Sequence, residues 1–254
     1  MTDALVAALI AARRVPRAIA PPSETRALSL PDAYAVQDRV RETLVAGGER
    51  LAGWKAAFTS AGMQKSYGTS EPVCGFLLAS GVLGSGAEVP MSRFVAPIAE
   101  AEIAFVMRSD LAGPGVTPPR ALLAVEGALA ALELPDVRMT GKPVGTDLVA
   151  DGIFANAIVL GTALVPVTHL DLALEGLVYE MNGAVVATNT AAEVLGNPLH
   201  SLTWIANHLG ARGLGLRAGD VVMTGSVSLL LRPKAGDAVR ASYTRLGSVS
   251  VRFA

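Results

Sequence analysis

From Leu51 onward the chain is divided into short segments, because glycine and proline interrupt runs of β-branched residues every few positions. Such segments are typical of strands, whereas the preceding residues carry longer runs with helical spacing. We therefore predict a helical N-terminal part (residues 1–50) joined to a β-rich catalytic body (residues 51–254), the two forming a single functional unit. Meandering strands with interspersed helices favour an α+β fold, with a mixed β-roll or sandwich rather than a doubly wound sheet.

Capping and turn residues predict the positions of individual elements. Ser29 with Pro31 and Asp32 predicts the start of a helix, which Gly47-Gly48 ends. Asn182-Gly183 is typical of a hairpin, because both residues tolerate the positive φ angles of a type I′ turn. The other predicted elements are a helix to about Arg14, a strand at 99–107, a helix from Thr117 to about Ala130, a helix opened by Asn197-Pro198, strands after Ala218-Gly219-Asp220 and Ala235-Gly236-Asp237, and a closing strand at 248–253.

The charge balance excludes several classes of partner. Lysine and arginine number 21 against 22 acidic residues, so the net charge is −1. A nucleic-acid-binding groove or a membrane-surface patch needs an excess of cations, and we expect neither partner here. The single cysteine, Cys74, excludes an intramolecular disulfide and a cysteine-rich zinc site.

The most apolar stretch is too short to span a bilayer. Ala4–Ala12 is the longest uninterrupted apolar run, with nine residues, whereas a spanning helix needs about 20. Arg13 and Arg14 follow this run, whereas a signal peptide carries its positive charge in front. We interpret the run as a buried or partner-facing helix, and we expect a cytoplasmic protein with no membrane span.

Two carboxylates in an apolar strand carry the strongest chemical signal. Glu100 and Glu102 point to the same face of the predicted strand, because side chains two residues apart share a face. Both faces are otherwise apolar, and buried carboxylates need a cation or a strong partner to stay ionised. A divalent metal that prefers oxygen, such as Mg²⁺ or Mn²⁺, meets that need. Alternatively, a Glu-Xaa-Glu pair at a strand end reaches solvent.

Two further charges lie among apolar neighbours. Glu133 stands between Leu132 and Leu134, and Lys55 stands between Trp54 and Ala56. A lysine beside a carboxylate-bound metal would suit an anionic, oxygen-rich substrate. As a lone residue, Lys55 could instead be a strand lysine whose ammonium reaches outward to solvent.

Short motifs in a consistent order extend this pattern over most of the chain. They are Gly53-Trp54-Lys55, Glu71-Pro72, Glu100-Ala101-Glu102, Ala131-Leu132-Glu133, Asp136 with Arg138, Ala150-Asp151, Met181-Asn182-Gly183, Leu195-Gly196-Asn197-Pro198 and Thr224-Gly225-Ser226. In their order and spacing the chain resembles the 2-keto-4-pentenoate hydratase and 4-oxalocrotonate decarboxylase family, within the fumarylacetoacetate hydrolase superfamily. The resemblance implies a fumarylacetoacetate hydrolase-like fold.

The resemblance also implies a site and an activity. It implies Mg²⁺ or Mn²⁺ held by Glu100, Glu102 and Glu133, a small 2-keto or 2-hydroxy-dienoic acid as substrate, and Lys55 as the catalytic residue near the reacting end. It implies a homo-oligomer and a lyase that adds water to the substrate, or alternatively releases CO₂ from it. The residues that it assigns to substrate binding are Asp136, Arg138, Asp151, Thr224 and Ser226.

Some positions depart from the usual pattern of that family. Val73 replaces an aspartate common in the hydratases, and Gly152 and Phe154 replace an amide and a small or hydroxylated residue. The lost polar groups would help to position water, so their absence favours decarboxylation. A catalytically silent homologue that stabilises an active partner is a further alternative. Hydrolysis of a carbon–carbon bond fits less well, because all three histidines follow Gly161.

Overall fold

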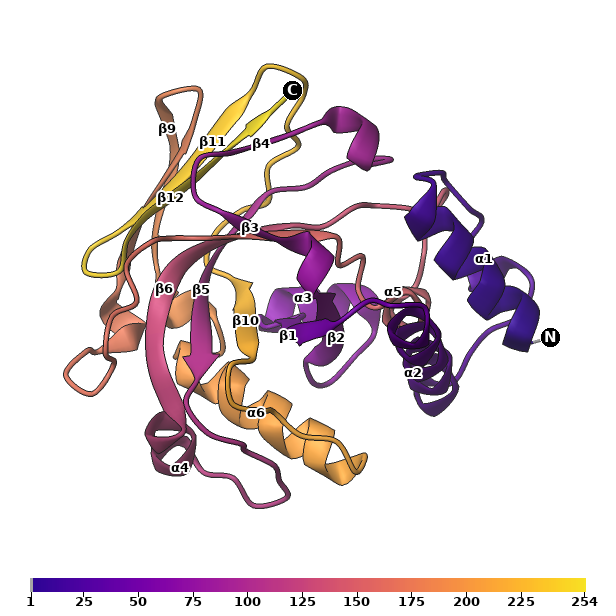
Figure 1. Ribbon diagram of the computed structural model, residues 1–254, viewed down its shortest axis with the longest axis horizontal. Coiled ribbons are helices and arrows are strands. Elements are labelled where there is room, and N and C mark those ends of the chain that lie inside the picture. Colours follow the sequence, from indigo (N-terminus) through magenta and orange to yellow (C-terminus); the bar gives the residue numbers. More distant parts are fainter. Residues whose placement is uncertain (1) are drawn as a thin grey trace.

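Two β-sheets form the body of the protein in a computed structural model that describes residues 2–254 (Figure 1). The strands are β1 (Leu51–Ala57), β2 (Val73–Leu78), β3 (Val82–Gly84), β4 (Ala87–Val89), β5 (Glu100–Met107), β6 (Val125–Leu134), β7 (Ala157–Leu160), β8 (Gly176–Met181), β9 (Ala184–Thr190), β10 (Val221–Ser226), β11 (Ala238–Tyr243) and β12 (Gly247–Phe253). The larger sheet has the order β2-β1-β10-β5-β6-β7-β3, and the smaller has the order β4-β12-β11-β8-β9. Strands β11 and β12 pack against β6, so the curled sheets share one core, and the predicted α+β roll or sandwich is confirmed.

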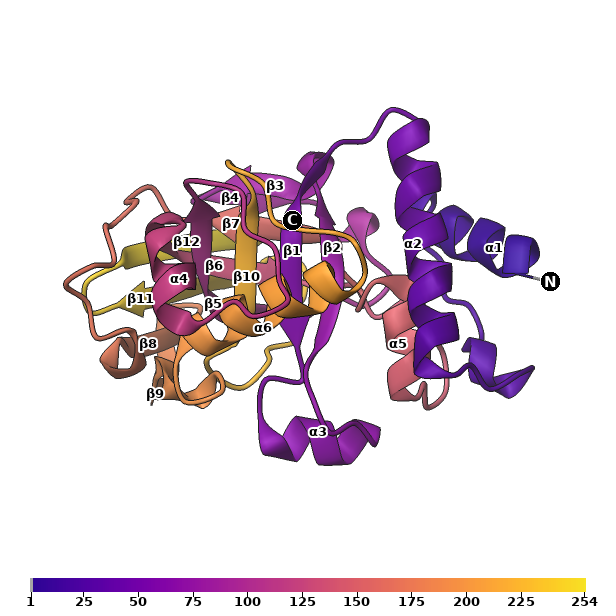
Figure 2. The same cartoon turned by 90° about the horizontal axis from the view of Figure 1, so that it is seen from below.

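Helices lie at the ends and outer faces of these sheets. They are α1 (Thr2–Arg14), α2 (Leu30–Ala46), α3 (Ala61–Tyr67), α4 (Pro118–Leu123), α5 (Gly145–Asp151) and α6 (Pro198–Ala211). Helices α1, α2 and α5 gather at the end of the molecule away from the smaller sheet, as both views show (Figures 1 and 2). The run Ala4–Ala12 lies within α1 and buries Leu9 and Ile10 in the core, so its apolar face is covered by the chain itself. No helix described between residues 2 and 254 is long and apolar enough to cross a bilayer.

Most of the predicted caps and turns are confirmed. The Ser29 hydroxyl accepts a hydrogen bond from the Asp32 backbone N–H at the start of α2. Asn182 and Gly183 have φ angles of 56° and 78° and join β8 to β9. Both Ala-Gly-Asp turns precede a strand, as expected, β10 in one case and β11 in the other.

One predicted helix is wrong over most of its length. The segment from Thr117 to Ala130 was expected to be helical, but α4 ends at Leu123 and β6 begins at Val125. The alanines and leucines of β6 favour a helix when considered alone. Here they are buried on both faces of the strand, between β5 and β7, so pairing with distant strands overrides their local preference. Glu133 therefore lies on a strand beside Glu100 and not after a helix.

The contact between α6 and α2 contains a titratable ring. The His208 ring stacks on that of Trp204 and is tilted against that of Tyr34, with a centroid distance of 4.7 Å in each case. Burial and the charge of Arg212 lower the His208 pKa from 6.5 to about 4, with Asp38 opposing the shift. The unfolded chain thus binds a proton at a pH where the folded chain does not, so His208 contributes stability above pH 6.5 that is lost as the pH falls towards 4.

We expect His208→Gln to remove part of the acid sensitivity of the fold. Between pH 7 and pH 5, wild-type protein should lose about 1 kcal/mol more unfolding free energy than the variant, since solvent reaching the ring screens its interactions. Urea unfolding at both pH values measures the difference. The exposed His200→Gln is the matched control, and it should keep the wild-type dependence. An identical loss in wild type and H208Q would contradict the prediction.

Candidate active site

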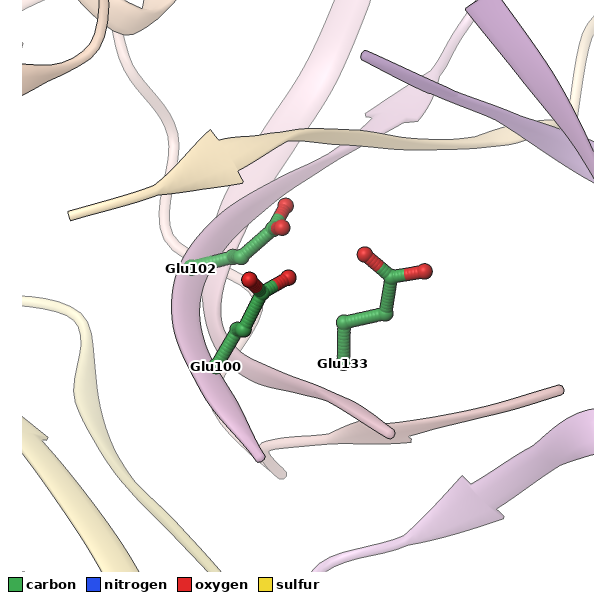
Figure 3. Close-up of side chains that lie close together, drawn as sticks. All are labelled: Glu100, Glu102 and Glu133. Carbon is green, nitrogen blue, oxygen red and sulfur yellow. The ribbon is translucent and has the colours of Figure 1, made fainter. Parts of the chain in front are cut away.

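Neighbouring strands of the larger sheet bring three glutamates together. Glu100 on β5 lies directly opposite Glu133 on β6, and Glu102 is two residues further along the same face. One ligand oxygen from each lies within 4.8 Å of the others, and the three carboxylates turn towards one another (Figure 3). Glu102 and Glu133 are only 1% and 0% exposed, whereas Glu100, at the start of β5, is partly exposed. Glu102 therefore does not reach solvent as a member of a strand-end pair would.

Lys55 on β1 completes this cluster. Its Nζ lies 2.6 Å from Glu133 Oε1 and donates a longer hydrogen bond, of 3.3 Å, to the Ile153 carbonyl. The side chain is 3% exposed. The alternative interpretation of Lys55 as an outward-reaching surface lysine is therefore wrong.

Burial and mutual repulsion shape the ionisation of the four groups. Burial raises the pKa of each glutamate; that of Glu100 is about 7 and that of Glu102 lies well above its ordinary value, with the Glu133 charge adding to both shifts. Lys55 opposes all three increases. Burial alone lowers the Lys55 pKa, but the three glutamates outweigh this and raise it, so the lysine stays an ammonium.

The unsatisfied oxygens of the cluster fit a divalent cation. Glu102 Oε2 accepts a hydrogen bond of 2.8 Å from the Gly225 backbone N–H. Glu102 Oε1 and Glu133 Oε2 are buried and have no hydrogen-bond partner among residues 2–254. Three carboxylates and one ammonium carry a formal charge of −2 when all are ionised, which a divalent ion would neutralise. Carboxylate oxygens are the ligands that Mg²⁺ and Mn²⁺ prefer.

The cluster lies at a cavity of about 660 Å³, a size that suits a small organic acid. Its wall combines the carboxylates of Glu100 and Glu102 and the Lys55 ammonium with hydroxyl groups and apolar side chains. Several polar wall residues were not predicted from the sequence, because nothing in their local pattern separates them from loop residues. They are Thr59, Ser60, Tyr67, Asn189, Glu193, Ser228 and Arg232.

The predicted substrate-binding residues divide into two groups. Ser226 lies on the cavity wall, whereas Asp136, Arg138, Asp151 and Thr224 are buried behind it. Arg138 Nη2 is 2.5 Å from Asp151 Oδ2, and Asp136 Oδ1 accepts backbone N–H groups of the loop before β5. Thr224 donates its hydroxyl hydrogen to the Ile103 carbonyl. These four residues are placed to support the wall, and direct contact with a substrate does not follow from their positions.

Phe154 and Val73, which both depart from the family pattern, lie in different places: Phe154 on the cavity wall and Val73 in the hydrophobic core. Phe154 has a φ of 57° and lines the cavity. Because it is part of the wall, this residue shapes the space open to a substrate. Val73 is 1% exposed and packs into the hydrophobic core. Among the described residues it is not part of the cavity wall, so Phe154 carries more weight than Val73 for the choice of substrate.

Gly225 is required by the packing that orients Glu102. Its φ is +110°, and a Cβ there would lie 2.3 Å from Thr59 Oγ1. We expect Gly225→Ala to lower the unfolding free energy by about 2 to 4 kcal/mol through strain and overpacking, and to weaken Mg²⁺ binding because the Gly225 N–H moves. Denaturant unfolding and calorimetric titration measure the two effects.

Gly236→Ala is the matched control for this substitution. Gly236 also has a positive φ, +91°, but a Cβ there meets no atom within 4 Å. The control should lose only about 1 kcal/mol and keep its Mg²⁺ affinity. Equal behaviour of the two variants would show that the contact with Thr59 has no consequence for the site.

Sequence and structure comparisons identify the family. Residues 48–254 match the family described as fumarylacetoacetate (FAA) hydrolase C-terminal. The chain belongs to the fumarylacetoacetate hydrolase family. It is 35% identical over 222 residues to 2-keto-4-pentenoate hydratase of Burkholderia vietnamiensis, which covers 87% of this chain and 85% of that protein. It is 34% identical over 227 residues to 4-oxalocrotonate decarboxylase of a Pseudomonas species, which covers 89% and 86%.

One solved structure matches over the whole chain. It is 4-oxalocrotonate decarboxylase from Pseudomonas putida, complexed with magnesium and adipate, with a TM-score of 0.96 and 31% sequence identity. The match covers 100% of this chain and 97% of that one. The resemblance to the hydratase and decarboxylase family, and the fumarylacetoacetate hydrolase-like fold that it implies, are confirmed.

Proposed function

We propose that this protein is a divalent-metal-dependent lyase for a small 2-keto or 2-hydroxy-dienoic acid, and foremost a hydratase of the 2-keto-4-pentenoate type. The observation that carries the proposal is the group of Glu100, Glu102 and Glu133 beside a cavity lined by Lys55. Glu102 and Glu133 are buried, and each has one oxygen without a hydrogen-bond partner among residues 2–254. The relatives named above are hydratases and decarboxylases, and the solved relative is complexed with magnesium.

Each residue of the cluster has a role in the proposed mechanism. Glu100, Glu102 and Glu133 would hold Mg²⁺ or Mn²⁺, and the bound ion would supply Lewis-acid polarisation of the carboxylate and C2 oxygen of the substrate. Lys55 is held by Glu133 and the Ile153 carbonyl, so its ammonium is oriented where it can donate a proton or stabilise developing negative charge. Apolar wall residues such as Ile98, Leu148 and Phe154 would shield the carbon chain of a bound substrate from water.

A decarboxylase is the second candidate. Arg232 favours it, because this residue could bind the second carboxylate of a substrate that loses CO₂. Arg232 lies on the cavity wall, and apart from Lys55 it is the only basic side chain there among the described residues. No hydrogen bond or ion pair joins it to another residue in the range 2–254, so its guanidinium is free to bind an anion. A second carboxylate on the substrate, distal to the metal-binding end, would be such an anion.

We expect Arg232→Gln to raise KM for a 2-hydroxy-dienoate with a distal carboxylate by about 5- to 10-fold, the value of one exposed charge-assisted contact. KM for the matching substrate without that carboxylate should not change. Steady-state kinetics on both substrates measure the effect. Lys234→Gln, an exposed neighbour outside the cavity wall, is the control variant. An equal change for the two substrates would remove Arg232 from substrate selection.

The mass of the product decides between the two reactions. Purified protein is incubated with Mg²⁺ and a 2-hydroxy-dienoate that bears a distal carboxylate, because this compound can either gain water or lose CO₂. Gain of water would establish the hydratase and loss of CO₂ the decarboxylase. If the protein binds Mg²⁺ and leaves every such acid unchanged, the lyase proposal is wrong, and the silent homologue that stabilises a partner is the better interpretation.

We also propose that the protein is a cytoplasmic homo-oligomer. Exposed apolar side chains gather on the hairpin of β8 and β9, where Val178, Val185 and Val186 are 40%, 60% and 38% exposed. Exposed apolar side chains on a hairpin at the edge of a sheet favour contact between copies of the chain. Sedimentation velocity tests this part of the proposal, and a monomer at micromolar concentration would contradict it.

A further inference from the structure

The wall of the cavity contains a strained segment directly after α5. Gly152, Ile153 and Phe154 have successive φ angles of 82°, 57° and 57°. A positive φ is rare for a bulky residue and especially for a β-branched one such as Ile153. Such a conformation persists only where surrounding contacts fix it. Ile153 and Phe154 both line the cavity, and the Ile153 carbonyl accepts the hydrogen bond from Lys55 Nζ.

A residue from the N-terminal helix fixes both ends of this segment. Arg13, on α1, donates hydrogen bonds to the Asp151 carbonyl and, at 2.9 Å, to the Ala155 carbonyl. Its Nη2 also lies 3.6 Å from Asp151 Oδ2, and its side chain is only 11% exposed. One guanidinium therefore connects the residue before the strained segment to the residue after it.

Gly152, the first residue of the strained segment, leaves space for the Arg13 guanidinium because it has no side chain. A Cβ at position 152 would lie 2.9 Å from Arg13 Nη2, so the glycine leaves room for the guanidinium. The guanidinium carbon of Arg13 also lies 5.1 Å from the centre of the Phe76 ring. Burial, followed by the Arg138 charge, lowers the Arg13 pKa to about 10, so the group is still charged at neutral pH.

Arg138 also contacts the residues that flank the segment, but it does not replace Arg13. Arg138 binds the Asp151 carboxylate at 2.5 Å, whereas its contact with the Ala155 carbonyl is long, at 3.4 Å. No hydrogen bond from Arg138 to the Asp151 carbonyl is present among the described residues. Arg13 thus makes the shorter contact beyond Phe154, and it belongs to α1, which precedes the part of the chain matched by the family.

We propose that Arg13 is a positioning residue for Lys55: it clamps the Asp151 and Ala155 carbonyls, and so holds the Ile153 carbonyl where it orients the lysine ammonium in the cavity. This proposal rests on the proposed function, in which Lys55 acts on the substrate. It assigns to the N-terminal helix a role in turnover, through a contact between residues far apart in the sequence.

The test compares Arg13→Gln and Arg13→Lys with Arg14→Gln, an exposed neighbour on the same helix for which we expect wild-type behaviour. We expect R13Q to lower kcat about 10- to 100-fold, in the range of a misplaced catalytic group. KM and the Kd for Mg²⁺ should stay within about threefold of wild type, because the glutamates lie on β5 and β6. R13K should retain an intermediate kcat, since its ammonium can still bind one of the two carbonyls. In a crystal structure of R13Q, Lys55 Nζ should lie beyond hydrogen-bond distance of the Ile153 carbonyl.

Several results would overturn the proposal. A kcat of R13Q within threefold of wild type would do so. A decrease in kcat accompanied by an increase in KM and weaker Mg²⁺ binding, all in proportion to the loss of folded protein, would also do so. An unchanged contact between Lys55 and Ile153 in the R13Q crystal structure would do the same without reference to activity. If wild-type protein converts no substrate, the proposed function fails by itself, and the crystal structure of R13Q still decides whether Arg13 positions Lys55.

Discussion

Glu102→Gln is expected to abolish metal-dependent turnover while leaving the fold intact. The carboxylate is 1% exposed, its Oε2 is fixed by the Gly225 N–H, and its Oε1 has no partner among residues 2–254. Glutamine keeps the shape and removes the charge that a divalent ion needs. We expect kcat/KM with Mg²⁺ to fall by at least roughly 1000-fold, which corresponds to about 4 kcal/mol of transition-state stabilisation. Calorimetric titration should show a matching loss of Mg²⁺ affinity.

The metal-free variant gives a second and independent signature. Removing one of three mutually repelling carboxylates relieves the repulsion that raises their pKa values. The unfolding free energy of metal-free E102Q should therefore rise by about 1 kcal/mol over that of metal-free wild type. Glu88→Gln, an exposed glutamate on β4, is the matched control and should change neither activity nor stability. Full metal affinity and turnover in E102Q would show that the glutamates are not the metal site.

The pairing of Glu100 with Glu102 could be predicted because it depends on local geometry alone. Side chains two residues apart on a strand share a face, and the apolar neighbours indicate that the face is buried. The place of Glu133 could not be derived in this way. Its contact with Glu100 depends on the register between β5 and β6, and the alanine-rich sequence of β6 predicts a helix when tertiary pairing is ignored. Its apolar neighbours made Glu133 a candidate third acid, and the resemblance to a family assigned it to the same metal as Glu100 and Glu102.

The positions of the charged residues behind the cavity wall could not be predicted from sequence patterns, for a different reason. Asp136, Arg138 and Asp151 were expected at the substrate, and the structure places them in a buried network under the wall. A motif shows that a charged residue matters without showing whether it faces a ligand or another residue. Arg13 gave no signal, because it joins segments separated by 138 positions and ends a helix where a basic residue is expected on electrostatic grounds alone. Long-range contacts of this kind follow from the assembled fold.

Lys55→Met is expected to separate catalysis from metal binding. The substitution keeps the apolar stem and removes the ammonium that pairs with Glu133 at 2.6 Å. We expect kcat to fall about 100- to 10,000-fold, the range for loss of a positioned acid–base group. Mg²⁺ should bind at least as tightly as in wild type, because the three glutamates remain and the competing positive charge has gone. Steady-state kinetics and calorimetric titration measure the two properties on the same preparation.

Thermal unfolding of the same variant tests the charge balance of the site. Without Lys55 the metal-free protein keeps three carboxylates, two of them buried, and loses the cation that compensates them, so its unfolding free energy should fall by about 3 to 5 kcal/mol. Mg²⁺ replaces the missing positive charge, and the increase in Tm on adding Mg²⁺ should therefore be larger in K55M than in wild type. Lys65→Met, an exposed lysine on α3, is the control and should match wild type in every measurement. Loss of Mg²⁺ binding in K55M would mean that the lysine organises the acids, and a kcat near that of wild type would mean that it has no part in the chemistry.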